Sequence, residues 1–73
     1  MEVTFKVWNR IPGEKRYSFQ RQFEDEVSAE NYIIIESRTA QVGTQYQIQR
    51  VRHWFDRDEE FIAKKITKQL KKV

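Results

Sequence analysis

Residues 45–55 read QYQIQRVRHWF, and the order of side chains in this stretch decides the expected fold. Tyr46 and Ile48 are two residues apart, the spacing of a β-strand with one buried face. Val51 and Phe55 have the opposite parity, so a regular strand cannot bury both pairs on one face. The sequence therefore predicts a third strand that is irregular in its middle.

A β-bulge is the expected form of this irregularity. In a regular strand, Arg50, Arg52 and Trp54 would follow Ile48 into the core, and burying two unpaired cations costs several kcal/mol each. One extra residue near Gln49-Arg50 would return the later apolar residues to the core. It would also turn Arg52 and Trp54 outward, together with Gln45 and Gln47.

The first 23 residues predict a β-hairpin around the turn residues Pro12 and Gly13. Residues 2–8 and 16–23 both alternate apolar and polar side chains, although Arg21 interrupts the second run, so this strand is expected to end or bulge there. The side chains expected to face the core are Val3, Phe5, Val7, Tyr17, Phe19 and Phe23. Those expected to face outward are Thr4, Lys6, Trp8, Arg16, Ser18, Gln20 and Gln22.

Residues 27–43 predict a helix, with Ser28 as N-cap and Gly43 as the C-terminal stop. The consecutive isoleucines in NYIIIESR favour a strand as the alternative. We prefer the helix because the segment has an N-cap residue at its start and a stop residue at its end.

Residues 56–73 predict a second, closing helix. Asp56 as N-cap with Glu59 three residues later resembles a capping box, and lysines crowd the last turn, where the helix dipole favours them. The apolar stripe of this helix would consist of Ile62, Ile66, Leu70 and Val73.

The order of elements is therefore ββαβα, in one α+β domain over residues 1–73. Helices separated in this way from a small sheet form two layers. We expect a three-stranded, mainly antiparallel sheet in the order 2-1-3, because a right-handed crossover can place strand three beside strand one. Both helices would cover one face and leave the other uncovered.

The uncovered face is the expected binding surface, and it would carry Lys6, Trp8, Arg52 and Trp54. Trp and Arg are enriched at protein–protein hot spots, so the leading expectation is a protein partner or a homodimer. The alternative is nucleic acid, with aromatic rings stacking on bases and cations contacting phosphate. The basic residues for that alternative are Arg50, Arg52, Lys64, Lys68, Lys71 and Lys72.

Composition argues against several other functions. A chain of 73 residues has little room for a large catalytic cavity, and His53 has no cysteine or suitably placed serine beside it, so we expect no catalytic residue and no small-molecule substrate. Neither a phosphate-binding loop nor a metal-ligand pattern occurs, so no cofactor or metal is expected. Without a secretory signal or membrane-length apolar run, a cytoplasmic location is expected.

Overall fold

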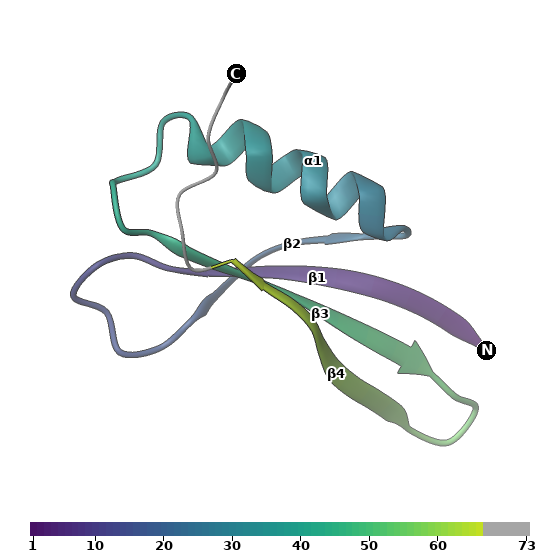
Figure 1. Cartoon of the computed structure of the whole chain (residues 1–73). Helices are drawn as coiled ribbons and strands as arrows, with labels where there is room; N and C mark the ends of the chain where they lie inside the picture. The colour runs from purple at the N-terminus through teal and green to yellow at the C-terminus, as the bar shows by residue number, and fades with distance from the viewer. Residues whose placement is uncertain (67–73) are drawn as a thin grey trace.

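A computed structural model describes residues 1–66, which form one helix against a four-stranded antiparallel sheet (Figure 1). The strands are β1 (Glu2–Arg10), β2 (Ser18–Phe23), β3 (Gln45–His53) and β4 (Asp58–Ile66), and the helix is α1 (Glu26–Ser37). The strand order in the sheet is β2-β1-β3-β4. The predicted order 2-1-3 is thus extended by one further strand.

The two central strands form a regular ladder, whereas each outer strand has one irregularity. β1 and β3 pair without a shift from Glu2 opposite His53 to Arg10 opposite Gln45. The β1–β2 register shifts between Val7 and Trp8, and the β3–β4 register shifts between Ile48 and Gln49. The centre of the sheet is therefore its most regular part.

The core lies between α1 and the middle of β1 and β3. Val7 and Ile48 are directly opposite each other and fully buried, and Ala29 and Ile33 of α1 pack against them. Burying an aliphatic side chain of this size contributes about 1.5–3 kcal/mol. The expectation that Val7, Ile48 and Tyr46 are buried is confirmed.

Helix α1 confirms the helical interpretation of the isoleucine run, but its ends differ from the prediction. Asp25 is the N-cap, and its carboxylate accepts a hydrogen bond of 2.7 Å from the backbone N–H of Ser28, which was the expected cap. The helix ends at Ser37, well before Gly43. Gly43 instead serves the turn into β3, where its φ of +96° and close approach to Pro12 favour a residue without a side chain.

The predicted closing helix is wrong, because residues 58–66 form β4. The backbone N–H of Trp54 donates a 2.7 Å hydrogen bond to the carbonyl of Arg57, closing a tight turn that folds β4 back on β3. Ladder pairing from His53–Asp58 to Tyr46–Ile66 then outweighs the local helical signals of this segment. The domain has four strands and one helix, not three strands and two helices, and it is still a small α+β domain. The expected helical positions Leu70 and Val73 lie outside the described residues.

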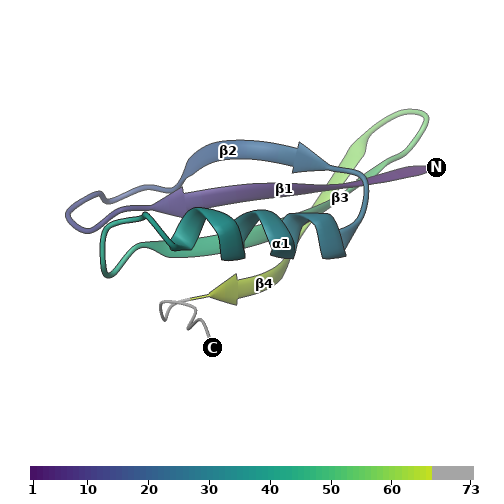
Figure 2. The ribbon, with the colours of Figure 1, turned by 90° about the horizontal axis from the view of Figure 1, so that it is seen from above.

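The helix is too short to cover the sheet. Twelve helical residues span about 18 Å, whereas nine strand residues span about 30 Å. Figures 1 and 2 show α1 lying over β1 and β3, while the turn between β3 and β4 extends beyond it. The sheet therefore has one face without a helix and, on the helix side, an uncovered end.

Candidate binding faces of the sheet

The sheet surface opposite α1 is called the open face below. Directly opposed residues of antiparallel strands share a face, so the buried pair Val7–Ile48 identifies the helix side and its sequence neighbours identify the open face. The open-face positions are Glu2, Thr4, Lys6, Trp8, Arg10, Phe19, Gln22, Gln45, Gln47, Gln49, Val51, His53, Asp58, Glu60, Ile62 and Lys65.

The structure corrects the predicted position of the bulge. β3 has no extra residue near Gln49-Arg50 in its pairing with β1. The unmatched residue lies in β4 instead, where Ile48 is opposite Lys64 and Gln49 is opposite Ile62, leaving Ala63 without a partner. Alternation along β3 therefore continues unbroken.

The four residues expected on one surface consequently lie on two. Lys6 and Trp8 are on the open face, whereas Arg52 follows the parity of Ile48 and lies on the helix side. Trp54 belongs with Arg52, because its indole Nε1 donates a 2.9 Å hydrogen bond to Glu59, the residue opposite Arg52. Val51, which was expected in the core beneath the helix, is fully buried on the open face, and Phe55 is fully exposed in the turn.

Two rows of side chains cross the open face near the β1–β2 turn. One row runs from Phe19 through Trp8 and Gln47 to Lys65, and the next runs from Gln22 through Lys6 and Gln49 to Ile62. Arg10 and Gln45 lie opposite each other beyond these rows. We call this region the basic half, because its charged side chains are Lys6, Arg10 and Lys65.

The aromatic pair of the basic half consists of Trp8 and Phe19. The two ring centroids are 5.5 Å apart at 71°, an edge-to-face arrangement, and Phe19 is 49% exposed. Phe19 was expected in the core. It lies on the open face because Gln20 is unmatched in the β1–β2 pairing, which changes the parity between Arg21 and Phe19.

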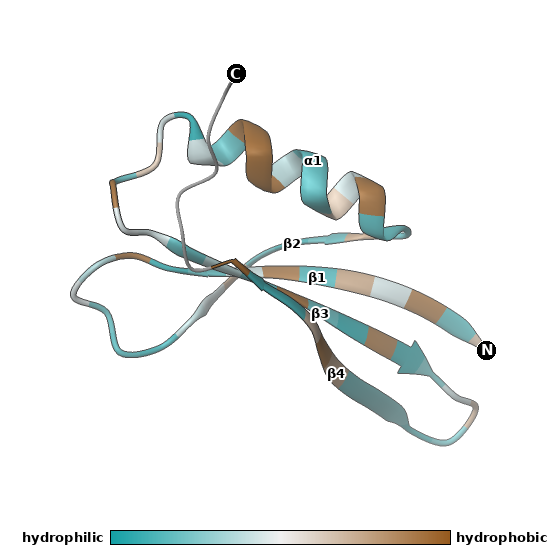
Figure 3. Ribbon diagram, viewed as in Figure 1, coloured by the Kyte–Doolittle hydropathy of each residue, from teal (hydrophilic) through white to brown (hydrophobic). Residues whose placement is uncertain are grey.

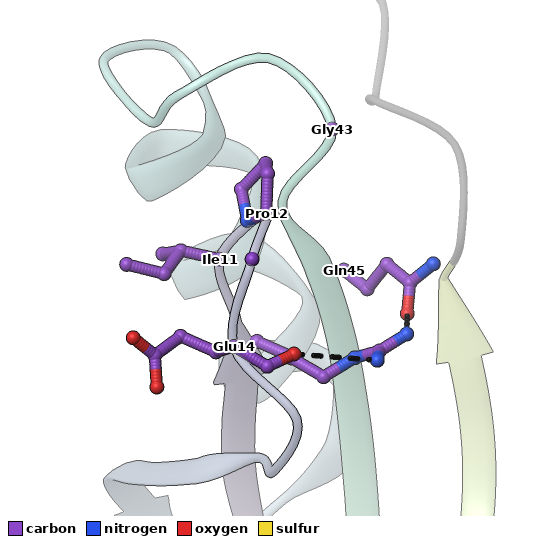
Figure 4. A pocket seen from close by; sticks show the side chains of 7 residues that line it. Ile11, Pro12, Glu14, Gly43 and Gln45 are labelled. Atoms are coloured by element: carbon purple, nitrogen blue, oxygen red, sulfur yellow. Dashed lines mark hydrogen bonds between the residues drawn. The ribbon is translucent and has the colours of Figure 1, made fainter.

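Arg10 is held at the end of the basic half. Its guanidinium donates hydrogen bonds to the carbonyl of Glu14 and to the side chain of Gln45 (Figure 4). These contacts lie beside a small hollow that is lined by the β1–β2 turn and by the turn at Gly43 before β3. The guanidinium also lies 5.6 Å from the ring centroid of Tyr17, within cation–π distance. These contacts fix the position of Arg10 beside the aromatic pair.

The opposite end of the open face, the acidic half, carries Glu2, Asp58 and Glu60. There the hydroxyl of Thr4 lies 2.8 Å from Nε2 of His53, and Nδ1 of His53 lies 3.0 Å from Asp58. This order of hydroxyl, imidazole and carboxylate resembles that of nucleophilic enzymes. Thr4, however, is 8% exposed within a central strand, so little of its side chain is accessible, although the residue helps to line a hollow with Glu2, Val3, Gln22 and Glu24. The side chains of Thr4, His53 and Asp58 therefore act as a link between β1, β3 and β4.

Thr4 was expected to face outward, and His53 was considered as a catalytic residue, but their contact with each other was not predicted. Thr4 and His53 are 49 positions apart, and they meet because Glu2 is opposite His53 in the β1–β3 ladder. Only the register of that ladder, and not a local motif, could have signalled this contact.

On the helix side, beyond the end of α1, arginines and aromatic rings form a second cluster. It consists of Arg50, Arg52, Trp54, Arg57 and Phe61, and we call it the arginine cluster. The guanidinium carbons of Arg50 and Arg52 lie 5.3 and 4.9 Å from the centroid of Phe61, and that of Arg57 lies 5.7 Å from the centroid of Trp54. Arg50 and Arg52 of the regular strand β3 therefore lie against Phe61 beyond the end of α1, and not beneath the helix.

Two carboxylates adjoin this cluster, Asp56, which lies 3.2 Å from Arg57, and the more extensively bonded Glu59. Glu59 accepts hydrogen bonds from Trp54 Nε1 and from Arg57, at 2.9 and 3.3 Å, and lies 4.0 Å from Arg52. The hydrogen bond from Trp54 and the neighbouring arginines lower the pKa of Glu59 below its ordinary value. The Nε atom of Arg50, by contrast, is buried and has no hydrogen-bond partner in the described part of the chain.

The lysines predicted for nucleic-acid binding do not form one group in the described structure. Lys64 lies on the helix side and makes an ion pair with Glu30 of α1, which raises the pKa of Lys64. It is therefore already engaged. Lys68, Lys71 and Lys72 lie outside the described residues.

No protein-family model, curated protein or solved structure matches the chain. Within residues 1–66, no helix is long and apolar enough to cross a membrane. The same residues contain no group of three or more acidic, histidine or cysteine side chains placed to hold a metal ion. The binding surfaces must therefore be judged from their own chemistry.

Proposed function

We propose that this protein is a non-enzymatic domain that binds single-stranded nucleic acid through the basic half of its open face. The observation that carries this proposal is the row Phe19, Trp8, Gln47 and Lys65, in which exposed aromatic surface, an amide and a cation lie side by side. Proteins that bind single strands combine aromatic side chains for base stacking with a basic surface for the phosphates.

Each component of the basic half has a role in this proposal. The rings of Trp8 and Phe19 provide surface on which an unpaired base stacks. Lys6, Arg10 and Lys65 surround these rings and provide contacts to phosphate. The glutamine amides between them can donate to and accept from base edges.

The distribution of the two tryptophans favours nucleic acid over self-association through this face. With Trp54 on the other side, the basic half retains one tryptophan among cations and glutamines. Charged residues are depleted from the cores of protein interfaces, and lysine especially so. The basic half is thus better suited to an anionic polymer than to a copy of itself.

Trp8 fluorescence provides the test. In a Trp54→Phe background, Trp8 is the only tryptophan, and titration with a labelled single-stranded oligonucleotide should quench it. If three cations contact phosphate, the logarithm of the binding constant should fall with that of the salt concentration with a slope of about −2.

Variants should then distinguish binding at the open face from non-specific attraction of the oligonucleotide to any positive charge on the protein. Phe19→Ala should weaken binding by about tenfold or more through lost stacking, and Lys6→Gln should reduce the salt slope by about 0.7 to 1. Arg38→Gln is the matched control, because Arg38 is an exposed cation at the C-cap of α1. The proposal fails if no oligonucleotide binds at low salt, or if Arg38→Gln weakens binding as much as Lys6→Gln.

A protein partner at the arginine cluster is the second candidate function. Trp54 is 38% exposed there, and the three arginines are accompanied by two carboxylates, Asp56 and Glu59, which leaves the cluster with a net positive charge. This favours an acidic segment of a partner. In a Trp8→Phe background, a polyglutamate peptide should change Trp54 fluorescence, and Arg50→Gln should weaken that response. If the peptide leaves the fluorescence unchanged, the second candidate is excluded.

A further inference from the structure

We infer that β4 pairs antiparallel with β4 of a second copy of this chain, joining the two sheets edge to edge. The β4 strand ends the strand order of the sheet, so its outer edge pairs with no other strand of the described residues. An edge strand presents backbone N–H and C=O groups that a second strand can use. This inference does not depend on nucleic-acid binding.

The sequence of β4 makes antiparallel self-pairing electrostatically favourable. The strand reads DEEFIAKKI, with carboxylates at its start, apolar residues in its middle and lysines near its end. Figure 3 shows hydrophilic colours at the end of β4 next to the turn and hydrophobic colours in its middle. Two such strands running in opposite directions bring the acidic end of each beside the basic end of the other. Parallel pairing would place like charges together.

The centre of the proposed contact is apolar and accessible. Phe61 is 38% exposed and Ile62 is 49% exposed, although both lie in the middle of a strand. With the two-fold axis between Ile62 and Ala63, Ile62 lies opposite Ala63 of the partner subunit on the open face, and Phe61 lies opposite Lys64 of the partner subunit on the helix side. Glu60 then comes beside Lys65 of the partner subunit, on the open face of both sheets. Lys65 has no ion pair within residues 1–66, so it is available for this contact.

The other edge strand lacks these properties. β2 reads SFQRQF over six residues, and its one charged side chain is Arg21. Antiparallel self-pairing of β2 would bring the two copies of Arg21 close together, and like charges opposed across strands are destabilising. Lysines on an edge strand commonly discourage pairing, but in β4 the carboxylates at the other end of the strand provide opposite charges for them.

Charge reversal tests the pairing. Glu60→Lys and Lys65→Glu should each raise the dimer dissociation constant by about tenfold, because each change affects two symmetry-related pairs. An equimolar mixture of the two variants should form a heterodimer with a dissociation constant close to that of the unaltered dimer, since the opposite charges again face each other. Sedimentation equilibrium measures all of these constants, and recovery in the mixture shows that both variants are folded.

The β1–β2 turn provides matched controls. Glu14→Lys and Lys15→Glu make the same charge changes at exposed positions away from β4, and should leave the dissociation constant unchanged. The inference is overturned if the unaltered full-length chain sediments as a monomer at every concentration. It is equally overturned if the β4 variants dimerise normally, if the mixture shows no recovery, or if the control variants weaken the dimer as strongly.

Discussion

The indole Nε1 of Trp8 donates a 3.1 Å hydrogen bond to Oε1 of Gln49, from the neighbouring strand and 41 positions away in the sequence. The Nε2 atom of Gln49 in turn donates a 3.2 Å hydrogen bond to the carboxylate of Glu60 in β4. One glutamine therefore joins three strands on the open face and fixes the ring that is proposed to stack on a base.

Replacing Gln49 by leucine should reduce the free energy of unfolding by about 0.5–1.5 kcal/mol, because the Trp8 indole and Glu60 lose their partner. Urea denaturation followed by circular dichroism measures this difference. Gln47→Leu is the control, since the Gln47 side chain lies opposite Trp8 but makes no hydrogen bond within residues 1–66. An equal loss in both variants would show that the hydrogen bonds of Gln49 contribute nothing specific.

Ile33→Ala should reduce the free energy of unfolding by about 2–5 kcal/mol, because the side chain is fully buried between α1 and the sheet. Ile35→Ala makes the same chemical change at a position that is 59% exposed, and should change stability by less than about 0.5 kcal/mol. Thermal or urea denaturation of the two variants compares them. A similar loss in both would contradict the placement of the helix on the sheet.

Thr4→Val should reduce the free energy of unfolding by about 0.5–1.5 kcal/mol, because valine keeps the shape but removes the hydroxyl bonded to His53. A double-mutant cycle with His53→Ala isolates the interaction between the two side chains. Thr39→Val, at an exposed position after α1, is the control and should have little effect. A coupling energy of zero would mean that the link does not stabilise the sheet.

Lowering the pH should destabilise the turn between β3 and β4, because the carboxylate of Glu59 becomes protonated. Its pKa is lower in the folded chain than the ordinary 4.5, chiefly because Trp54 donates a hydrogen bond to its carboxylate. The resulting stability is fully present above the unfolded-state pKa and is lost as the pH falls through the lower, folded-state value. In a Trp8→Phe background, Trp54 fluorescence should therefore change below about pH 4.5, and Glu59→Gln should remove this transition. A transition of unchanged size in Glu59→Gln would assign it to another group.

The strands and helix that depend on local signals could be predicted from the sequence. Alternating side chains identified β1 and β3, and Ser28 and Gly43 on either side of the isoleucines indicated α1, although the helix is capped by Asp25 and Arg38 instead. The segment after His53 could not be predicted in the same way, because its acidic start and lysine-rich end suit a helix. Its conversion to β4 depends on the ladder with β3, which is a long-range interaction.

The candidate surface was harder to predict than the elements. Lys6 and Trp8 were correctly expected to face away from the helix. Arg52 and Trp54 were not, because β3 pairs with β1 without the expected bulge, and nothing in the local sequence of β3 shows that the irregularity lies at Ala63 in β4 instead. The arginine cluster follows from the length of α1, which ends before it can cover that part of the sheet.

The unmatched residues Gln20 and Ala63 also bear on which insertions and deletions this fold can accept. Deleting either one would give its strand a continuous ladder while every other side chain keeps its face, since the residues on either side already alternate across it. A deletion within β1 or β3 would instead move all later side chains of that strand to the opposite face. Changes in chain length are therefore tolerated at two positions in the outer strands and excluded from the central pair.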